Sequence, residues 1–211
     1  RIRTQPDGQV SYRGLFRSLS DVEIGLPGEH QRANAALAMA AVEIADRKGL
    51  WVDDRAMRLG IGCVSWEARG EVLMRKPTFL LDGAHNPAGV RTLCRTLKND
   101  FSYRRLILIF AALADKDYSR MLRTLAVLAD VIILPPLATG RAANPKRLAC
   151  ELEGAQVTVM ETDSVCEALK KALGLAKKND LICAAGSLYL AGEIKQLFAR
   201  GASCGKCLGE K

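Results

Sequence analysis

From residue 77 to residue 200, short apolar runs alternate with amphipathic runs of helical spacing, and this alternation constrains the fold most. The apolar runs have the length of strands and occupy residues 77–82, 104–113, 130–137, 156–161 and 180–186. A helical pattern follows each of them, at residues 86–101, 117–129, 144–152, 163–179 and 187–200. Five such units predict an α/β fold with a mostly parallel sheet and helices on both faces. The unbroken apolar character of the strands agrees with a parallel sheet, because parallel strands are buried on both faces.

The first 75 residues follow a different pattern. The expected elements are strands joined by a turn, an alanine-rich helix, a shorter helix and a further strand, at residues 9–28, 29–50, 53–64 and 68–74. These elements are too few for a complete domain. We therefore expect the end of a larger domain whose beginning is absent, and the lack of an initiator Met also suggests a fragment.

Three regions follow from these patterns. Residues 1–75 are expected to be the C-terminal portion of an incomplete domain, and residues 76–200 a Rossmann-like domain. Residues 201–211 are expected to form a flexible tail. The tail holds the pair Cys204 and Cys207, whose spacing is a weak zinc or redox signal and equally suits a frayed end.

Composition excludes several classes of protein. The 211 residues are 49% hydrophobic and 26% charged, which is typical of a globular chain. No apolar stretch reaches the roughly 18 residues that span a membrane, and no signal peptide is visible. The seven scattered cysteines suit a reduced, cytoplasmic protein. A net charge of +8 suits an anionic partner such as a nucleotide or a carboxylate-rich metabolite. Because the charge is dispersed and aromatic residues are only 5%, we expect no nucleic-acid partner.

The segment LLDGAHNP, residues 80–87, places polar groups where a strand ends and a helix begins. Ligands of open parallel sheets bind beyond the C-terminal ends of the strands. Gly83 allows a tight turn, Asn86 can cap the helix and Pro87 suits its first turn. Asp82 could bind ribose hydroxyls, and His85 could bind a phosphate or transfer a proton. A polar helix-start turn without a ligand explains the segment equally well.

D-G-A-H-N-P resembles the signature of folylpolyglutamate synthase and dihydrofolate synthase, members of the Mur ligase superfamily. Three other stretches are similar to family motifs in the same order: GEHQRANAALAMAAVE, FAALADKDYSRML and AAGSLYLAGEIKQLF. The resemblance covers residues 25–198. The His-Asn-Pro ending also distinguishes the chain from relatives that build peptidoglycan.

The resemblance implies an ATP-dependent ligase that joins glutamate to a folate or to dihydropteroate. In this family ATP phosphorylates a carboxylate, and the α-amine of L-glutamate attacks the acyl phosphate. Enzymes catalyse such reactions mainly by positioning the reactants and by neutralising charge. Mg²⁺ is implied as well, with its ligands in the absent N-terminal part of the same protein.

The resemblance also assigns roles on the nucleotide side. Asn34 matches a residue that contacts adenine, and Arg69 matches an arginine that reaches the ATP phosphates. Asp82 matches the ribose-binding aspartate. His85 matches the neighbouring histidine and is the one catalytic candidate. The bland alternatives are a helix-surface asparagine for Asn34 and a surface arginine for Arg69. The family usually reads Trp-Pro-Gly-Arg where this chain reads WEAR, so its Pro-Gly turn is replaced.

On the glutamate side, the resemblance assigns Lys116 and Ser187 to the carboxylates of the incoming amino acid. An ammonium and a hydroxyl are suitable donors to an anion. The alternatives are a lysine paired with Asp115 or Asp117, and a serine that caps a helix.

The chain lacks the phosphate-binding loop that a complete ligase requires. Residues 201–207, GASCGKC, have the wrong glycine spacing and no Ser or Thr for magnesium. The chain is therefore expected to fold, to bind ATP weakly and to be inactive alone. Two alternatives remain: a Mur-type ligase with another acceptor, and a non-catalytic α/β module that binds an anionic metabolite.

Overall fold

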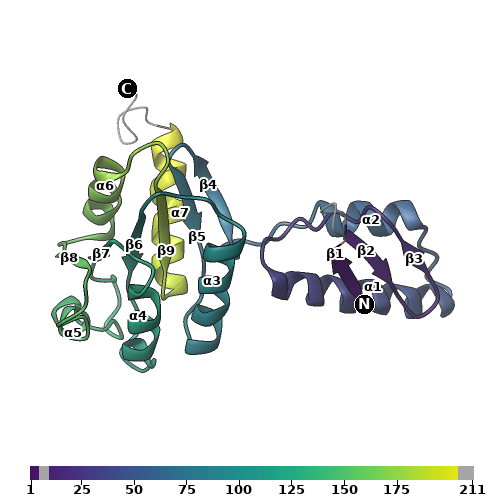
Figure 1. Cartoon of the computed structure of the whole chain (residues 1–211), viewed down its shortest axis with the longest axis horizontal. Helices are drawn as coiled ribbons and strands as arrows, with labels where there is room; N and C mark the ends of the chain where they lie inside the picture. Colours follow the sequence, from purple (N-terminus) through teal and green to yellow (C-terminus); the bar gives the residue numbers. More distant parts are fainter. Residues whose placement is uncertain (5–9, 204–211) are drawn as a thin grey trace. The chain divides into compact units, whose positions relative to one another are not determined.

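The chain forms two compact units, Arg1–Glu67 and Ala68–Lys211. The structure, a computed structural model, describes residues 1–4 and 10–203 (Figure 1). The pair Cys204 and Cys207 lies outside the described residues. Within the described residues, no helix is long and apolar enough to cross a membrane.

The first unit contains a small antiparallel sheet and two helices. Its sheet has the order β1-β2-β3. The elements are β1 (Ile2–Thr4), β2 (Val10–Arg13), β3 (Ser18–Leu19), α1 (Glu29–Arg47) and α2 (Asp54–Gly62). Their kinds and order confirm the prediction of strands, an alanine-rich helix and a shorter helix. The unit has a small core, made of Tyr12, Leu19, Val22, Met39 and Met57.

The second unit is built on a six-stranded sheet of order β4-β5-β9-β6-β7-β8. The strands are β4 (Glu71–Arg75), β5 (Thr78–Leu81), β6 (Leu106–Phe110), β7 (Val131–Leu134), β8 (Thr158–Glu161) and β9 (Leu181–Ala185). Every pairing is parallel except that of β4 with β5. The predicted α/β fold with a mostly parallel sheet is therefore confirmed.

Helices cover both faces of this sheet. They are α3 (Pro87–Asn99), α4 (Tyr118–Ala126), α5 (Pro145–Cys150), α6 (Val165–Leu175) and α7 (Leu188–Ser203). Buried residues of α3, α4 and α5 form one apolar cluster with one face of the strands. Buried residues of α6 and α7 form a second cluster with the other face. Strand residues alternate between the clusters, as Leu106 and Ile107 do, because successive side chains of a strand point to opposite faces.

The division between the units falls after Glu67 rather than after residue 75. The strand expected at 68–74 forms as β4, but it pairs with β5 in the second sheet. A short hairpin joins the two strands, so β4 extends the edge of that sheet. The hydrophobic pattern predicted the strand and could not indicate its partner.

Candidate functional site

The carboxyl ends of three neighbouring strands, β5, β9 and β6, define the candidate site. β9 lies between β5 and β6, although it follows them in the sequence. The segments after β5 and β9 are tied together, since the N–H of Gly186 donates to the carbonyl of Ala84 at 2.9 Å. A change in strand order of this kind is where open α/β sheets bind ligands.

Asp82 follows β5 and is half-buried. Its Oδ1 accepts from the N–H of Ala84 and its Oδ2 from that of Gly70, each at 2.9 Å. A carboxylate has about four lone-pair sites, so these two contacts do not by themselves exhaust its acceptor capacity. Asp82 therefore organises the backbone at the end of β5, at the edge of the sheet.

His85 is exposed just beyond Asp82. Its Nδ1 lies 2.9 Å from the carbonyl oxygen of Gly83. Because a carbonyl only accepts hydrogen bonds, Nδ1 carries a proton in this contact, and Nε2 is the nitrogen left for a ligand. Asn86 caps α3, with its side chain accepting from the N–H of Gly89 at 2.8 Å, and Pro87 is the first helical residue. The structural roles predicted for Asn86 and Pro87 are confirmed.

Arg69 lies in a tight turn that is anchored to the same strand end. Its neighbours Ala68 and Gly70 have φ of 52° and 62°. The carbonyl of Ala68 accepts from the N–H of Gly83 at 2.6 Å. The left-handed conformation costs a non-glycine residue about 1–2 kcal/mol, so Ala68 holds the shape that glycine would favour in the related Pro-Gly turn. The turn thus forms, and it leaves the Arg69 side chain exposed.

Ser187 and Lys116 come from the other two strand ends. Ser187 is buried, and its Oγ accepts from the N–H of Tyr189 at 3.1 Å, as expected of a helix cap. Lys116 is half-buried and forms an ion pair with Asp115 at 3.4 Å. Neither contact uses the hydroxyl proton of Ser187 or all three ammonium protons of Lys116. Both residues can therefore serve the fold and still donate to an anion.

The second unit thus brings five of the six predicted site residues to one edge of the sheet. The sixth, Asn34, belongs to α1 of the first unit. Asn34 is exposed, and its amide donates to Gln31 Oε1 at 3.0 Å. Its role as an adenine contact stays a prediction.

Gly186 is a site residue that sequence reasoning missed. It has φ of 110°, and a Cβ there would lie 2.5 Å from the carbonyl oxygen of Ala111 and 2.7 Å from the ring of Phe110. The segments that carry Ser187 and Lys116 can approach each other only because this residue is glycine. A glycine directly after an apolar strand was the available signal.

The described residues offer magnesium no complete set of ligands. Among them, no group of three or more His, Cys, Asp or Glu side chains is placed to hold a metal ion. The acidic side chain at the end of β5, Asp82, already accepts from two backbone N–H groups. We therefore assign no step of the chemistry to a metal bound by these residues.

Comparison with known proteins identifies the class. Residues 67–188 match the family described as "Mur ligase, glutamate ligase domain". Since the match covers more than half of the chain, the protein belongs to the Mur ligase family.

Relatives within the family narrow this assignment. The chain is 32% identical over 190 residues to dihydrofolate synthase/folylpolyglutamate synthase of Bacillus subtilis, covering 89% of this chain and 44% of the relative. It is 33% identical over 197 residues to folylpolyglutamate synthase of Lacticaseibacillus casei, covering 92% and 44%. The structure of Mycobacterium tuberculosis folylpolyglutamate synthase complexed with ADP and AMPPCP matches with a TM-score of 0.83 and 30% identity, covering 95% of this chain and 47% of that chain. The resemblance to folylpolyglutamate and dihydrofolate synthases is thereby confirmed, and the chain spans about half the length of these relatives.

Proposed function

We propose that this chain is the C-terminal part of an ATP-dependent ligase that adds glutamate to a folate or to dihydropteroate. One observation carries the proposal: a member of the glutamate ligase family gathers Arg69, Asp82, His85, Lys116 and Ser187 at one edge of its parallel sheet. In this reaction a carboxylate oxygen of the acceptor attacks the γ-phosphorus of ATP, the bond from that phosphorus to the β–γ bridging oxygen breaks, and ADP leaves. The α-amine of glutamate then attacks the acyl carbon, and the bond between this carbon and the phosphate-bearing oxygen breaks. Phosphate leaves, the amine nitrogen loses a proton to solvent, and an amide is formed.

The end of β5 would bind the nucleotide. Asp82 offers a charged acceptor to the two ribose hydroxyls, and Arg69 offers a planar fork of donors to phosphate oxygens. As an imidazolium, His85 would donate from Nε2–H to a phosphate oxygen, because its Nδ1–H already donates to the carbonyl of Gly83. The contact between Gly70 and Asp82 supports a joint role, since it fixes the turn of Arg69 beside the aspartate.

The ends of β9 and β6 would bind the incoming amino acid. Ser187 and Lys116 can each donate to a glutamate carboxylate. The short connection between Ala84 and Gly186 supports this arrangement, because it holds the glutamate side of the edge next to the nucleotide side.

The phosphate-binding loop and the magnesium ligands would come from a preceding part of the same protein. The solved relative with ADP and AMPPCP supports a nucleotide in the complete protein, and this chain covers 47% of it. The 211 residues alone should therefore bind ATP weakly and should not catalyse ligation. Calorimetric titration of ATP into the isolated chain tests this expectation, and micromolar affinity would contradict it.

The activity itself is tested with the complete protein that contains this chain. We expect release of ADP to require both glutamate and either dihydropteroate or a reduced folate. Lys116→Gln should raise the KM for glutamate about tenfold or more, the effect of losing one charge-assisted hydrogen bond, and should leave the KM for ATP unchanged. Lys170→Gln on the exposed face of α6 is the matched control. If the rate of ADP release did not depend on either folate compound, the proposal would be refuted.

Another Mur-type acceptor is the alternative that the family assignment leaves open. The same assay, run with a UDP-linked muramoyl peptide in place of the folate, distinguishes a folate ligase from a Mur-type ligase with another acceptor. A non-catalytic anion-binding module would release no ADP with any acceptor.

A further inference from the structure

The opposite edge of the same three strands carries a basic pocket. Its volume is about 620 Å³, and it lies at the amino ends of β5, β6 and β9. The lining residues are Arg75, Lys76, Thr78, Ser102, Tyr103, Arg104, Lys178, Asn179 and Asp180. Strand β9 separates the two edges, and the six residue steps from Asp180 to Gly186 span about 20 Å. A small ligand in this pocket therefore cannot contact the candidate ligase site.

Positive charge dominates the basic pocket. Four of its nine lining residues are Lys or Arg and one is acidic, which gives a net charge of 4 − 1 = +3. Arg75, Lys76 and Lys178 are exposed, and their side chains form no ion pair within residues 1–4 and 10–203. Three cations thus remain uncompensated around one pocket.

The acidic residue of the pocket is already neutralised. Asp180 is buried, and its Oδ2 accepts from Arg105 Nη2 at 2.7 Å and from the N–H of Lys177 at 2.9 Å. Its Oδ1 accepts from Arg104 Nε at 3.4 Å. The carboxylate therefore anchors the loops that bear the cations and does not cancel their charge toward solvent.

Three separate segments supply the cations. Arg75 is the last residue of β4, and Lys76 lies in the turn that follows it. Arg104 belongs to the loop before β6, and Lys178 to the loop before β9. The last two loops are joined by the N–H of Arg104, which donates to the carbonyl of Asn179 at 2.9 Å. Thr78, Ser102 and Asn179 add neutral hydrogen-bonding groups.

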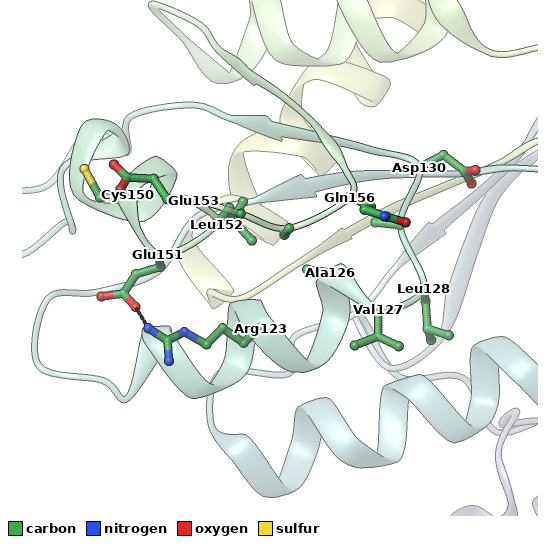
Figure 2. Close-up of a pocket in the computed structure, with 13 residues that line it drawn as sticks. Arg123, Ala126, Val127, Leu128, Asp130, Cys150, Glu151, Leu152, Glu153 and Gln156 are labelled. Carbon is green, nitrogen blue, oxygen red and sulfur yellow. Dashed lines mark hydrogen bonds and ion pairs between the residues drawn. The ribbon is translucent and has the colours of Figure 1, made fainter.

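A second pocket in this unit, of about 820 Å³, lacks this character (Figure 2). Its lining includes Asp130, Glu151 and Glu153, and its single arginine, Arg123, forms an ion pair with Glu151 at 2.9 Å. The second pocket therefore carries no comparable excess of positive charge.

We propose that the basic pocket binds a small molecule with two or more anionic groups, as phosphates or as carboxylates. Cations spread over three segments suit several anionic groups better than one. The inference does not depend on the proposed ligase activity, because the pocket and the ligase site lie at opposite edges of the sheet.

Calorimetric titration of the 211-residue chain at low ionic strength tests the site. The probes are pyrophosphate and γ-linked triglutamate, which separate a phosphate ligand from a carboxylate ligand. We expect at least one probe to bind, and Lys76→Gln/Lys178→Gln to weaken it about tenfold. The double variant Lys48→Gln/Lys170→Gln has the same net charge and should retain wild-type affinity.

Hydrogen exchange provides a second readout, since a bound anion should protect the amides of Arg104 and Asn179. Failure of both probes to bind the wild-type chain would overturn the proposal. It would equally be overturned if the control double variant weakened binding as much as Lys76→Gln/Lys178→Gln.

Discussion

At the scale of single residues, the candidate site depends on side chains that also hold the backbone. Asp82 joins the turn of Arg69 to the end of β5, and Gly186 lets the end of β9 approach the end of β6. Substitutions at these positions should therefore change stability as well as binding. The two effects can be separated by comparison with controls in the same unit.

Asp82→Asn tests the first of these residues. The amide keeps one acceptor oxygen and turns a donor toward a backbone N–H, so one of the N–H groups of Gly70 and Ala84 loses its partner. We expect the free energy of unfolding to fall by about 1–3 kcal/mol and amide exchange at Gly70 or Ala84 to accelerate. Asp100→Asn, exposed at the end of α3, should change stability by less than about 0.5 kcal/mol. Unchanged exchange at both amides would contradict this role.

Gly186→Ala tests the role of Gly186 at the end of β9. The new methyl group would overlap the carbonyl oxygen of Ala111 and the ring of Phe110, at a φ of 110°. We expect a loss of about 3 kcal/mol or more in urea unfolding. Gly192→Ala in α7 is the matched control, because nothing lies within 4 Å of its added Cβ. That helical, exposed position should gain about 0.5–1 kcal/mol. Equal effects of the two substitutions would show that the segments can separate freely.

At the scale of elements, the sequence predicted the strands and helices of the second unit because their apolar runs are long and uninterrupted. It did not predict the insertion of β9 between β5 and β6, since a buried strand carries no mark of its neighbours. It also did not predict the ion pair between Glu71 and Lys195, at 2.9 Å, which joins residues 124 positions apart. The positions of Asp82 and His85 at the carboxyl end of β5 could be predicted, because both come within four residues of the end of an apolar run. The left-handed turn at Ala68 was not, because alanine rarely adopts it.

The loop between α6 and β9 should make the second unit sensitive to acid. Burial raises the pKa of Asp180, but hydrogen bonds from Arg105 and the N–H of Lys177 outweigh it and hold this pKa at about 2. A lowered pKa stabilises the fold above the unfolded value of 3.8, and the contribution is lost as the pH falls toward 2. The free energy of unfolding should fall through this range.

Asp180→Asn separates this effect from general acid denaturation. The variant should lose about 3 kcal/mol at neutral pH, because the guanidinium of Arg105 loses its buried partner. Its unfolding free energy should also depend less steeply on pH between 3.8 and 2 than that of the wild type. If the free energy of unfolding depended on pH equally in the variant and the wild type, Asp180 would be excluded as the source of the acid sensitivity.

At the scale of the whole molecule, the first unit exposes more large hydrophobic residues than the second. Nine of the thirteen exposed large hydrophobic residues among the described residues lie in Arg1–Glu67, and they include Trp51 at 81% exposure and Leu37 at 72%. Exposed apolar side chains that gather into a patch mark interaction surfaces. This supports the proposal that a further part of the complete protein packs against the first unit.

Fluorescence of the dye ANS measures that surface. We expect the 211-residue chain to bind more ANS than an equal concentration of the complete protein, since the additional part would cover apolar side chains. Leu37→Gln, on the exposed face of α1, should reduce the signal of the isolated chain. Equal ANS binding by the two proteins would indicate that this surface stays uncovered.

The most direct test of the central claim is a crystal structure of the complete protein with AMPPCP and glutamate. The account predicts the ribose at Asp82, the phosphates at Arg69 and His85, and the glutamate carboxylates at Lys116 and Ser187. A nucleotide bound away from the carboxyl end of β5, with Asp82 and Arg69 uninvolved, would contradict it.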